Sequence, residues 1–159
     1  MKATSLLTGI LLMLSLAGFS QTQYEVIADP SKAKILKGII NKGLIKNDSA
    51  YQWYAENQKS YMSPDTAIVG KLQRDNSVKY IVFGGTWCDD TRVILPKFFM
   101  LQEKAGIKDD RITLFGVDRE KQTIGNIASA LNITNVPTIL VMKNGKEIGR
   151  VVEYGKTGK

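Results

Sequence analysis

The sequence of 159 residues contains no histidine and a single cysteine, Cys88. Without histidine, the chain cannot supply a Ser–His–Asp triad, a histidine metal ligand or a histidine proton relay. With one cysteine it cannot form an internal disulfide, so a reactive or intermolecular thiol has to be weighed against a buried, inert one. No motif indicates a metal site or an organic cofactor, and we expect neither.

Acidic residues are outnumbered, with 15 Asp and Glu against 22 Lys and Arg and a formal net charge of +7. The basic residues are spread along the chain and cluster only mildly over residues 32–46. A solvated basic face explains this better than a binding site for nucleic acid. Since no signature of a nucleic-acid-binding fold is present, we expect no nucleic-acid partner.

The apolar run at the N-terminus is too short to span a bilayer. Lys2 precedes the run, which covers residues 6–16, and small residues follow up to Ser20. This order is typical of a secretory signal peptide of bacterial type over residues 1–20, and the alternative is an uncleaved membrane anchor. We expect a periplasmic or secreted protein that does not stay inserted in the membrane after cleavage.

Residues 21–75 are expected to form an N-terminal extension with two helices. Asp48 is a good N-cap for the first helix, over residues 49–59. Ser63, followed by Pro64, predicts the start of the second. We expect these helices to cover the domain that follows rather than to dock a partner.

The stretch before these helices is harder to interpret. Alternating apolar residues at 24–27 indicate a short strand. Residues 35–45 have a nearly helical spacing of apolar side chains, but Gly38 and Gly43 weaken a helix. A strand or an irregular cover fits this stretch equally well.

The remaining residues, 76–159, alternate between patterns of buried strands and helices. The expected elements are strand 80–83, a helix from after Cys88 to near Gly106, strand 112–117, helix 124–131, and strands 139–142 and 148–152. The first two strands must run parallel because a long helix crosses between them. Asn-Gly between the last two strands predicts an antiparallel hairpin. The fold class is therefore α/β, with a mixed central sheet flanked by helices.

Cys88 lies where the first of these strands gives way to the long helix. The N–H groups and partial positive charge of a helix start favour a thiolate over a thiol. Thr91 lies one turn along the helix, where its hydroxyl is expected to donate a hydrogen bond to the sulfur. Asp89 and Asp90 act in the opposite direction, because their charge disfavours a second anion nearby. We expect a moderately activated thiol.

Residues 83–91, with Trp directly before Cys88, resemble the active-site turn of the thioredoxin family. Pro96 follows the cysteine by eight residues, where thioredoxins kink this helix. The segment around Pro137 resembles the cis-proline loop of that family, and the terminal hairpin follows in the right order. The resemblance covers about residues 78–154 and implies a thioredoxin-like domain over residues 76–159.

The resemblance also implies how the site is built. Pro137 would be cis and lie against Cys88, and the backbone of Val136 would pair with an extended substrate segment. Trp87 would form part of the apolar rim around the thiol. The two aspartates after the cysteine, Asp89 and Asp90, would belong to the same substrate-binding surface.

The sequence departs from the family at three places. Thr91 stands where thioredoxins carry the resolving cysteine, which makes this a CxxT variant unable to complete a dithiol cycle alone. Val82 and Leu114 occupy the positions of the buried acid and the lysine that faces it. The sequence given stops at Lys159, where thioredoxins continue into a last helix.

Two functions are compatible with this site. The first is monothiol exchange, as an oxidoreductase or isomerase: Cys88 would attack a disulfide of a protein partner, and an external reductase or small thiol would release it. The alternative is a non-catalytic thioredoxin-like module that retains client proteins through Cys88 or binds them at the Pro137 loop.

Overall fold

The computed structural model describes residues 23–31, 33–75 and 77–155. The predicted signal peptide, residues 1–20, lies outside this part. The described residues contain one sheet with the strand order β1-β2-β4-β3-β5-β6. Its strands are β1 (Tyr24–Ala28), β2 (Lys34–Ile40), β3 (Val78–Gly84), β4 (Ile112–Gly116), β5 (Thr138–Lys143) and β6 (Lys146–Val152). β3 and β4 run parallel and the other neighbouring pairs antiparallel, so the predicted mixed α/β sheet is confirmed.

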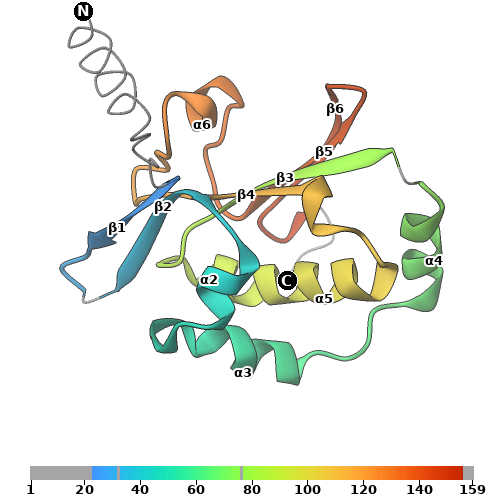
Figure 1. Ribbon diagram of the computed structural model, residues 1–159, viewed down its shortest axis with the longest axis horizontal. Coiled ribbons are helices and arrows are strands. Elements are labelled where there is room, and N and C mark those ends of the chain that lie inside the picture. Colours follow the sequence, from blue (N-terminus) through green and yellow to red (C-terminus); the bar gives the residue numbers. More distant parts are fainter. Residues whose placement is uncertain (1–22, 32, 76, 156–159) are drawn as a thin grey trace, which may run out of the picture.

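Helices lie on both sides of this sheet (Figure 1). They are α2 (Lys42–Lys46), α3 (Trp53–Ser60), α4 (Thr66–Arg74), α5 (Asp89–Ala105) and α6 (Ile127–Ala130), with 3₁₀ turns η2 (Ser49–Tyr51) and η3 (Asp109–Arg111). α5 lies along one face with α3 beside it, and α6 lies on the opposite face. Over the residues that the structure describes, none of these helices combines the length and apolarity needed to cross a membrane.

The N-terminal extension contributes strands as well as helices. β1 and β2 form an antiparallel hairpin that joins the sheet along β4. The stretch left open between helix and strand is therefore β2 followed by the short α2. Gly38 belongs to the strand, where its φ is +120° and an added Cβ would lie 2.4 Å from the carbonyl oxygen of Gln23. Gly38, which weakened the prediction of a helix, thus allows β1 and β2 to pair closely.

The helix starts of the extension differ from the prediction. Asp48 does cap, since its carboxylate accepts a hydrogen bond from the N–H of Ala50, but it begins only the 3₁₀ turn η2. The single helix expected over residues 49–59 is instead η2 followed by α3, which has its own N-cap at Gln52. Ser63 does not cap α4, which begins two residues after Pro64 with Asp65 as its N-cap. The Asp65 carboxylate accepts from the N–H of Ala67 at 2.7 Å, and so satisfies one of the N–H groups that a helix start leaves without an intrahelical partner.

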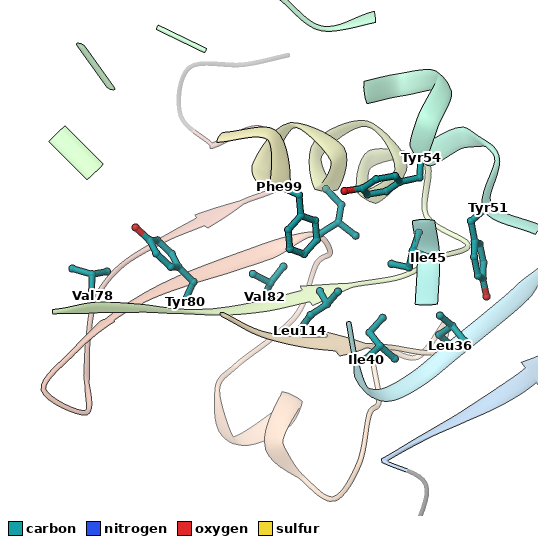
Figure 2. Close-up of a cluster of buried hydrophobic side chains, with 11 residues drawn as sticks. Leu36, Ile40, Ile45, Tyr51, Tyr54, Val78, Tyr80, Val82, Phe99 and Leu114 are labelled. Carbon is teal, nitrogen blue, oxygen red and sulfur yellow. The ribbon is translucent and has the colours of Figure 1, made fainter. Parts of the chain in front are cut away.

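The larger core lies between the sheet and α5, and residues of the extension complete it (Figure 2). The strands contribute Tyr80 and several aliphatic side chains, α5 contributes Phe99, and Tyr51 and Tyr54 come from η2 and α3. Burial raises the pKa of the Tyr51 hydroxyl to about 12. The predicted role of the extension helices as a cover for the domain fits this arrangement.

A second core lies on the face that carries α6. Its buried members are Phe83, Phe115, Val117, Ala128, Ile133, Val136 and Leu140. The rings of Phe83 and Phe115 stack with centroids 5.0 Å apart. Trp87 and Cys88 pack against this cluster, which places the cysteine at the rim of an apolar core rather than inside it.

Candidate functional site

Cys88 occupies the N-cap position of α5 and is half-buried. Its N–H donates to the carbonyl of Gly85 at 2.9 Å, and its own carbonyl accepts from the N–H of Arg92 at 3.1 Å. These two bonds turn the chain from the end of β3 into the helix. Cys88 therefore begins α5, as the sequence predicted, but its side chain accepts no capping hydrogen bond from the first N–H groups of the helix.

The loop before β5 brings a backbone carbonyl to the sulfur. The Sγ atom of Cys88 lies 3.2 Å from the carbonyl oxygen of Val136, to which the thiol donates. The peptide bond between Val136 and Pro137 is cis, and both residues are buried. The hydroxyl of Thr138 donates to the carbonyl of Asn135 at 2.7 Å and closes this loop.

Trp87 forms one wall of the site and is held from several sides. Its indole N–H donates to the carbonyl of Val117 at 2.9 Å. The guanidinium of Arg119 lies 5.1 Å from the centre of the ring system, within the range of a cation–π contact. Arg119 is itself bound by the carboxylate of Asp29, in the turn between β1 and β2. The N-terminal hairpin therefore helps to build this wall.

Thr91 supports the loop that carries the thiol, but it forms no hydrogen bond with the sulfur. Its side chain is fully buried, and its Oγ1 accepts from the N–H of Gly85 at 3.2 Å. The predicted bond to Cys88 was wrong, because the side chain points inward under the end of β3. An added Cβ on Gly84 would lie 3.0 Å from the methyl group of Thr91, which shows how tightly the two segments pack.

The two aspartates after the cysteine both have partners. Asp89 is exposed and pairs with Arg92 at 3.1 Å. Asp90 accepts a hydrogen bond from the hydroxyl of Tyr154 at 2.9 Å. This bond, above all, raises the pKa of Tyr154. From the sequence we expected only the negative charge of the two carboxylates, without these partners. The i,i+3 spacing of Asp89 and Arg92 was a readable signal, whereas Tyr154 is 64 residues from its partner.

Thr86 fastens the cysteine loop to the N-terminal hairpin. Its buried hydroxyl donates to the carbonyl of Lys34 at 3.0 Å and accepts from the N–H of Leu36 at 3.2 Å. The Nε of Arg92 donates to the carbonyl of Thr86 at 3.2 Å, which ties the same residue to α5. No local pattern around Thr86 indicates this role, since its partners lie about fifty residues away.

The two positions at which the resemblance places a buried acid and a lysine carry apolar residues, and these lie side by side. Val82 and Leu114 are register partners on β3 and β4, and both are buried. Within the described part of the chain, no three residues among Cys, Asp and Glu are grouped so as to hold a metal ion. The chemistry available at this site is that of one thiol beside a helix start and a backbone carbonyl.

Comparison with known proteins gives a family match for this architecture. The thioredoxin family model matches residues 65–158. A thioredoxin-like protein of Acanthamoeba polyphaga mimivirus is 31% identical over 78 residues, which is 49% of this chain and 54% of that protein. A thioredoxin of Staphylococcus epidermidis is 28% identical over 80 residues, 50% of this chain and 72% of the relative. This chain thus spans about half the length of the viral protein.

Among solved structures, an HIV epitope-scaffold matches with a TM-score of 0.50 at 21% identity. The match covers 70% of this chain and 69% of the scaffold, and it supports the fold alone.

Proposed function

Because the thioredoxin family model covers more than half of the sequence, the chain belongs to the thioredoxin family, and we propose that it exchanges thiols and disulfides through Cys88. The observation that carries this proposal is the position of the sulfur. It lies half-buried at the N-cap of α5 and 3.2 Å from the carbonyl oxygen of Val136, at the meeting point of two loops. A sulfur at the rim of the core, rather than inside it, can be reached by the disulfide of a partner protein.

The first step is attack by the Cys88 thiolate on one sulfur of the partner disulfide. A new S–S bond joins Cys88 to the partner while the old one breaks. The second partner sulfur leaves with the electron pair and takes up a proton from solvent. The partner segment would lie against Trp87, Asp89 and Asp90, next to the loop of Val136 and Pro137, whose side chains are buried.

The second step needs a thiol from outside the chain, because Thr91 stands where a resolving cysteine would attack. The thiolate of a small thiol, a reductase or the partner itself attacks the partner sulfur of the mixed disulfide. The bond to Cys88 breaks, and Cys88 leaves with the electron pair as a thiolate. If the attacking thiol is external, the partner is reduced to the extent that this thiol is oxidised. If it belongs to the partner, the disulfide is isomerised.

The predicted signal peptide over residues 1–20 supports a periplasmic or secreted location for this exchange. Those compartments are oxidising, so proteins in them carry disulfides that such a thiol can attack.

The experiment is disulfide exchange with a small model disulfide and a fluorescent disulfide-bonded peptide, comparing the wild type with Cys88→Ala. We expect a mixed disulfide at Cys88 by mass spectrometry, its release by a small thiol, and loss of both in the variant. Equal turnover in the Cys88→Ala protein contradicts the proposal. Adducts that form but resist a physiological thiol favour instead the module that retains clients without turnover.

A further inference from the structure

The turn that follows β6, residues 153–155, contacts both the loop before β5 and the first turn of α5. Sheet pairing brings it there, since Val152 at the end of β6 pairs with Thr138 at the start of β5. The N–H of Glu153 donates to the carbonyl of Pro137 at 2.7 Å. The carboxylate of Glu153 accepts from the side chain of Asn135 at 3.1 Å. One residue later, Tyr154 reaches across to Asp90 on α5.

The charged and titratable groups around Cys88 come from several elements. On α5, Asp89 is paired with Arg92, whereas Asp90 depends on Tyr154. From other elements come Glu153, bound to the loop before β5, and Arg119, which lies over Trp87. Tyr61, after α3, donates its hydroxyl to the carbonyl of Val93 on α5. Asp90 is therefore the acidic neighbour of Cys88 that has a phenol rather than a cation as its partner.

We propose that Tyr154 is a positioning residue for the exchange reaction, because its hydroxyl holds the Asp90 carboxylate and so weakens the repulsion between that carboxylate and a Cys88 thiolate. The inference rests on the proposed function of Cys88 as the reacting sulfur. A carboxylate that accepts an O–H bond is fixed in direction, and part of its charge is compensated. Without this donor, the Asp90 side chain is able to turn toward the N–H groups of the helix start, where a thiolate also gains its stabilisation.

Two features of Tyr154 suit this role. It is half-buried, so its hydroxyl is held in place rather than exchanging freely between water molecules. Its pKa is raised, first by the bond to Asp90, so it remains a donor at the pH values where thiols titrate. Tyr154 also interacts electrostatically with Cys88 and Tyr61, which places all three groups in one neighbourhood.

The test is the rate at which uncharged iodoacetamide alkylates Cys88, measured against pH. The proteins compared are the wild type, Tyr154→Phe, Asp90→Asn and the double variant. We expect Tyr154→Phe to move the midpoint of the profile upward by about half a pH unit, about a threefold slower rate below the midpoint. Asp90→Asn is expected to move it downward. In the Asp90→Asn background, Tyr154→Phe is expected to change nothing further, because Tyr154 acts through Asp90.

The matched control is Tyr61→Phe, which also removes a phenol hydroxyl bound to α5 but leaves the carboxylate of Asp90 with its partner. We expect its alkylation midpoint to equal that of the wild type. An unchanged midpoint in Tyr154→Phe, or an equal effect of Tyr154→Phe with and without Asp90, overturns the proposal. Should Tyr154→Phe fail to fold, Asp90→Asn alone decides, since an unmoved midpoint there also overturns it.

The failure of this inference and the failure of the proposed function give different results. Alkylation reports on the thiolate of Cys88 and needs no disulfide partner. A wild type that is alkylated but exchanges with no disulfide contradicts the proposed function. A wild type that exchanges normally, with a midpoint insensitive to Tyr154 and Asp90, contradicts only the role of Tyr154.

Discussion

The Sγ atom of Cys88 and the carbonyl oxygen of Val136 lie 3.2 Å apart, although 48 residues separate them in the chain. The sheet explains this proximity. Phe83 near the end of β3 pairs with Thr138 at the start of β5, so the segment leaving one strand lies beside the segment entering the other. Residues on these two segments form the site, and each is supported by a different part of the chain.

A Thr91→Cys variant is expected to form an internal disulfide with Cys88. Position 91 is fully buried one helical turn after Cys88, and its side chain contacts the loop that carries the thiol. Quantifying free thiols in buffers of graded redox potential should reveal a dithiol couple. Loss of the bond from the N–H of Gly85 should cost about 1 kcal/mol of the free energy of unfolding. Thr91→Ser, which keeps the hydroxyl, is the control: its one thiol, Cys88, is either free or in a mixed disulfide with the buffer, and no dithiol couple should appear.

A Gly85→Ala variant is expected to displace the indole of Trp87. The added Cβ would lie 2.7 Å from both Nε1 and Cε2 of that ring, which also donates to Val117. We expect a loss of about 1–3 kcal/mol in the free energy of unfolding by urea, with a changed tryptophan emission. Gly70→Ala is the control. An added Cβ there would lie in open space within α4, so a gain of about 0.5–1 kcal/mol is expected. Equal effects of the two substitutions contradict this prediction.

A Thr86→Val variant is expected to loosen the contact between the cysteine loop and β2. The carbonyl of Lys34 keeps the hydroxyl of Tyr51 as a donor at 3.1 Å. The N–H of Leu36 loses its acceptor. Leaving this buried donor without a partner should lower the free energy of unfolding by about 1–3 kcal/mol. Hydrogen exchange of the Leu36 amide should accelerate, and Thr86→Ser should restore it. A Leu36 amide equally protected in all three proteins argues against the role of Thr86.

An Asp29→Asn variant is expected to be destabilised at neutral pH but less so in acid. The guanidinium of Arg119, followed by bonds from Ser31, holds the pKa of the Asp29 carboxyl well below its usual range. A folded-state pKa below the unfolded value of about 3.9 gives stability that is fully present above that value. This stability is lost as the pH falls toward the folded value. The difference in melting temperature between wild type and variant should therefore be largest at neutral pH and should shrink progressively as the pH falls below about 4. A constant difference across that range contradicts this assignment.

Local patterns predicted much of the fold because the forces involved act over a few residues. The turn at Asn144 and Gly145 has positive φ at both residues, as a two-residue hairpin requires, and β5 and β6 pair across it. The parallel pairing of β3 and β4 followed from the long helix between them. The prediction that Ser63 caps the second helix was wrong, because Asp65 is an equally suitable N-cap and lies directly before α4.

The sequence by itself determined that one thiol, without histidine or a second cysteine, begins a helix. Those are properties of residue types and of short spacings. Only the tertiary structure decided what surrounds that thiol. Thr91 forms a hydrogen bond with the N–H of Gly85, Thr86 with the backbone of β2, and Tyr154 with the carboxylate of Asp90. The last two contacts join residues brought together by strand pairing. No pattern along the chain encodes which partner a buried hydroxyl or carboxylate will meet, because packing of the whole sheet decides it.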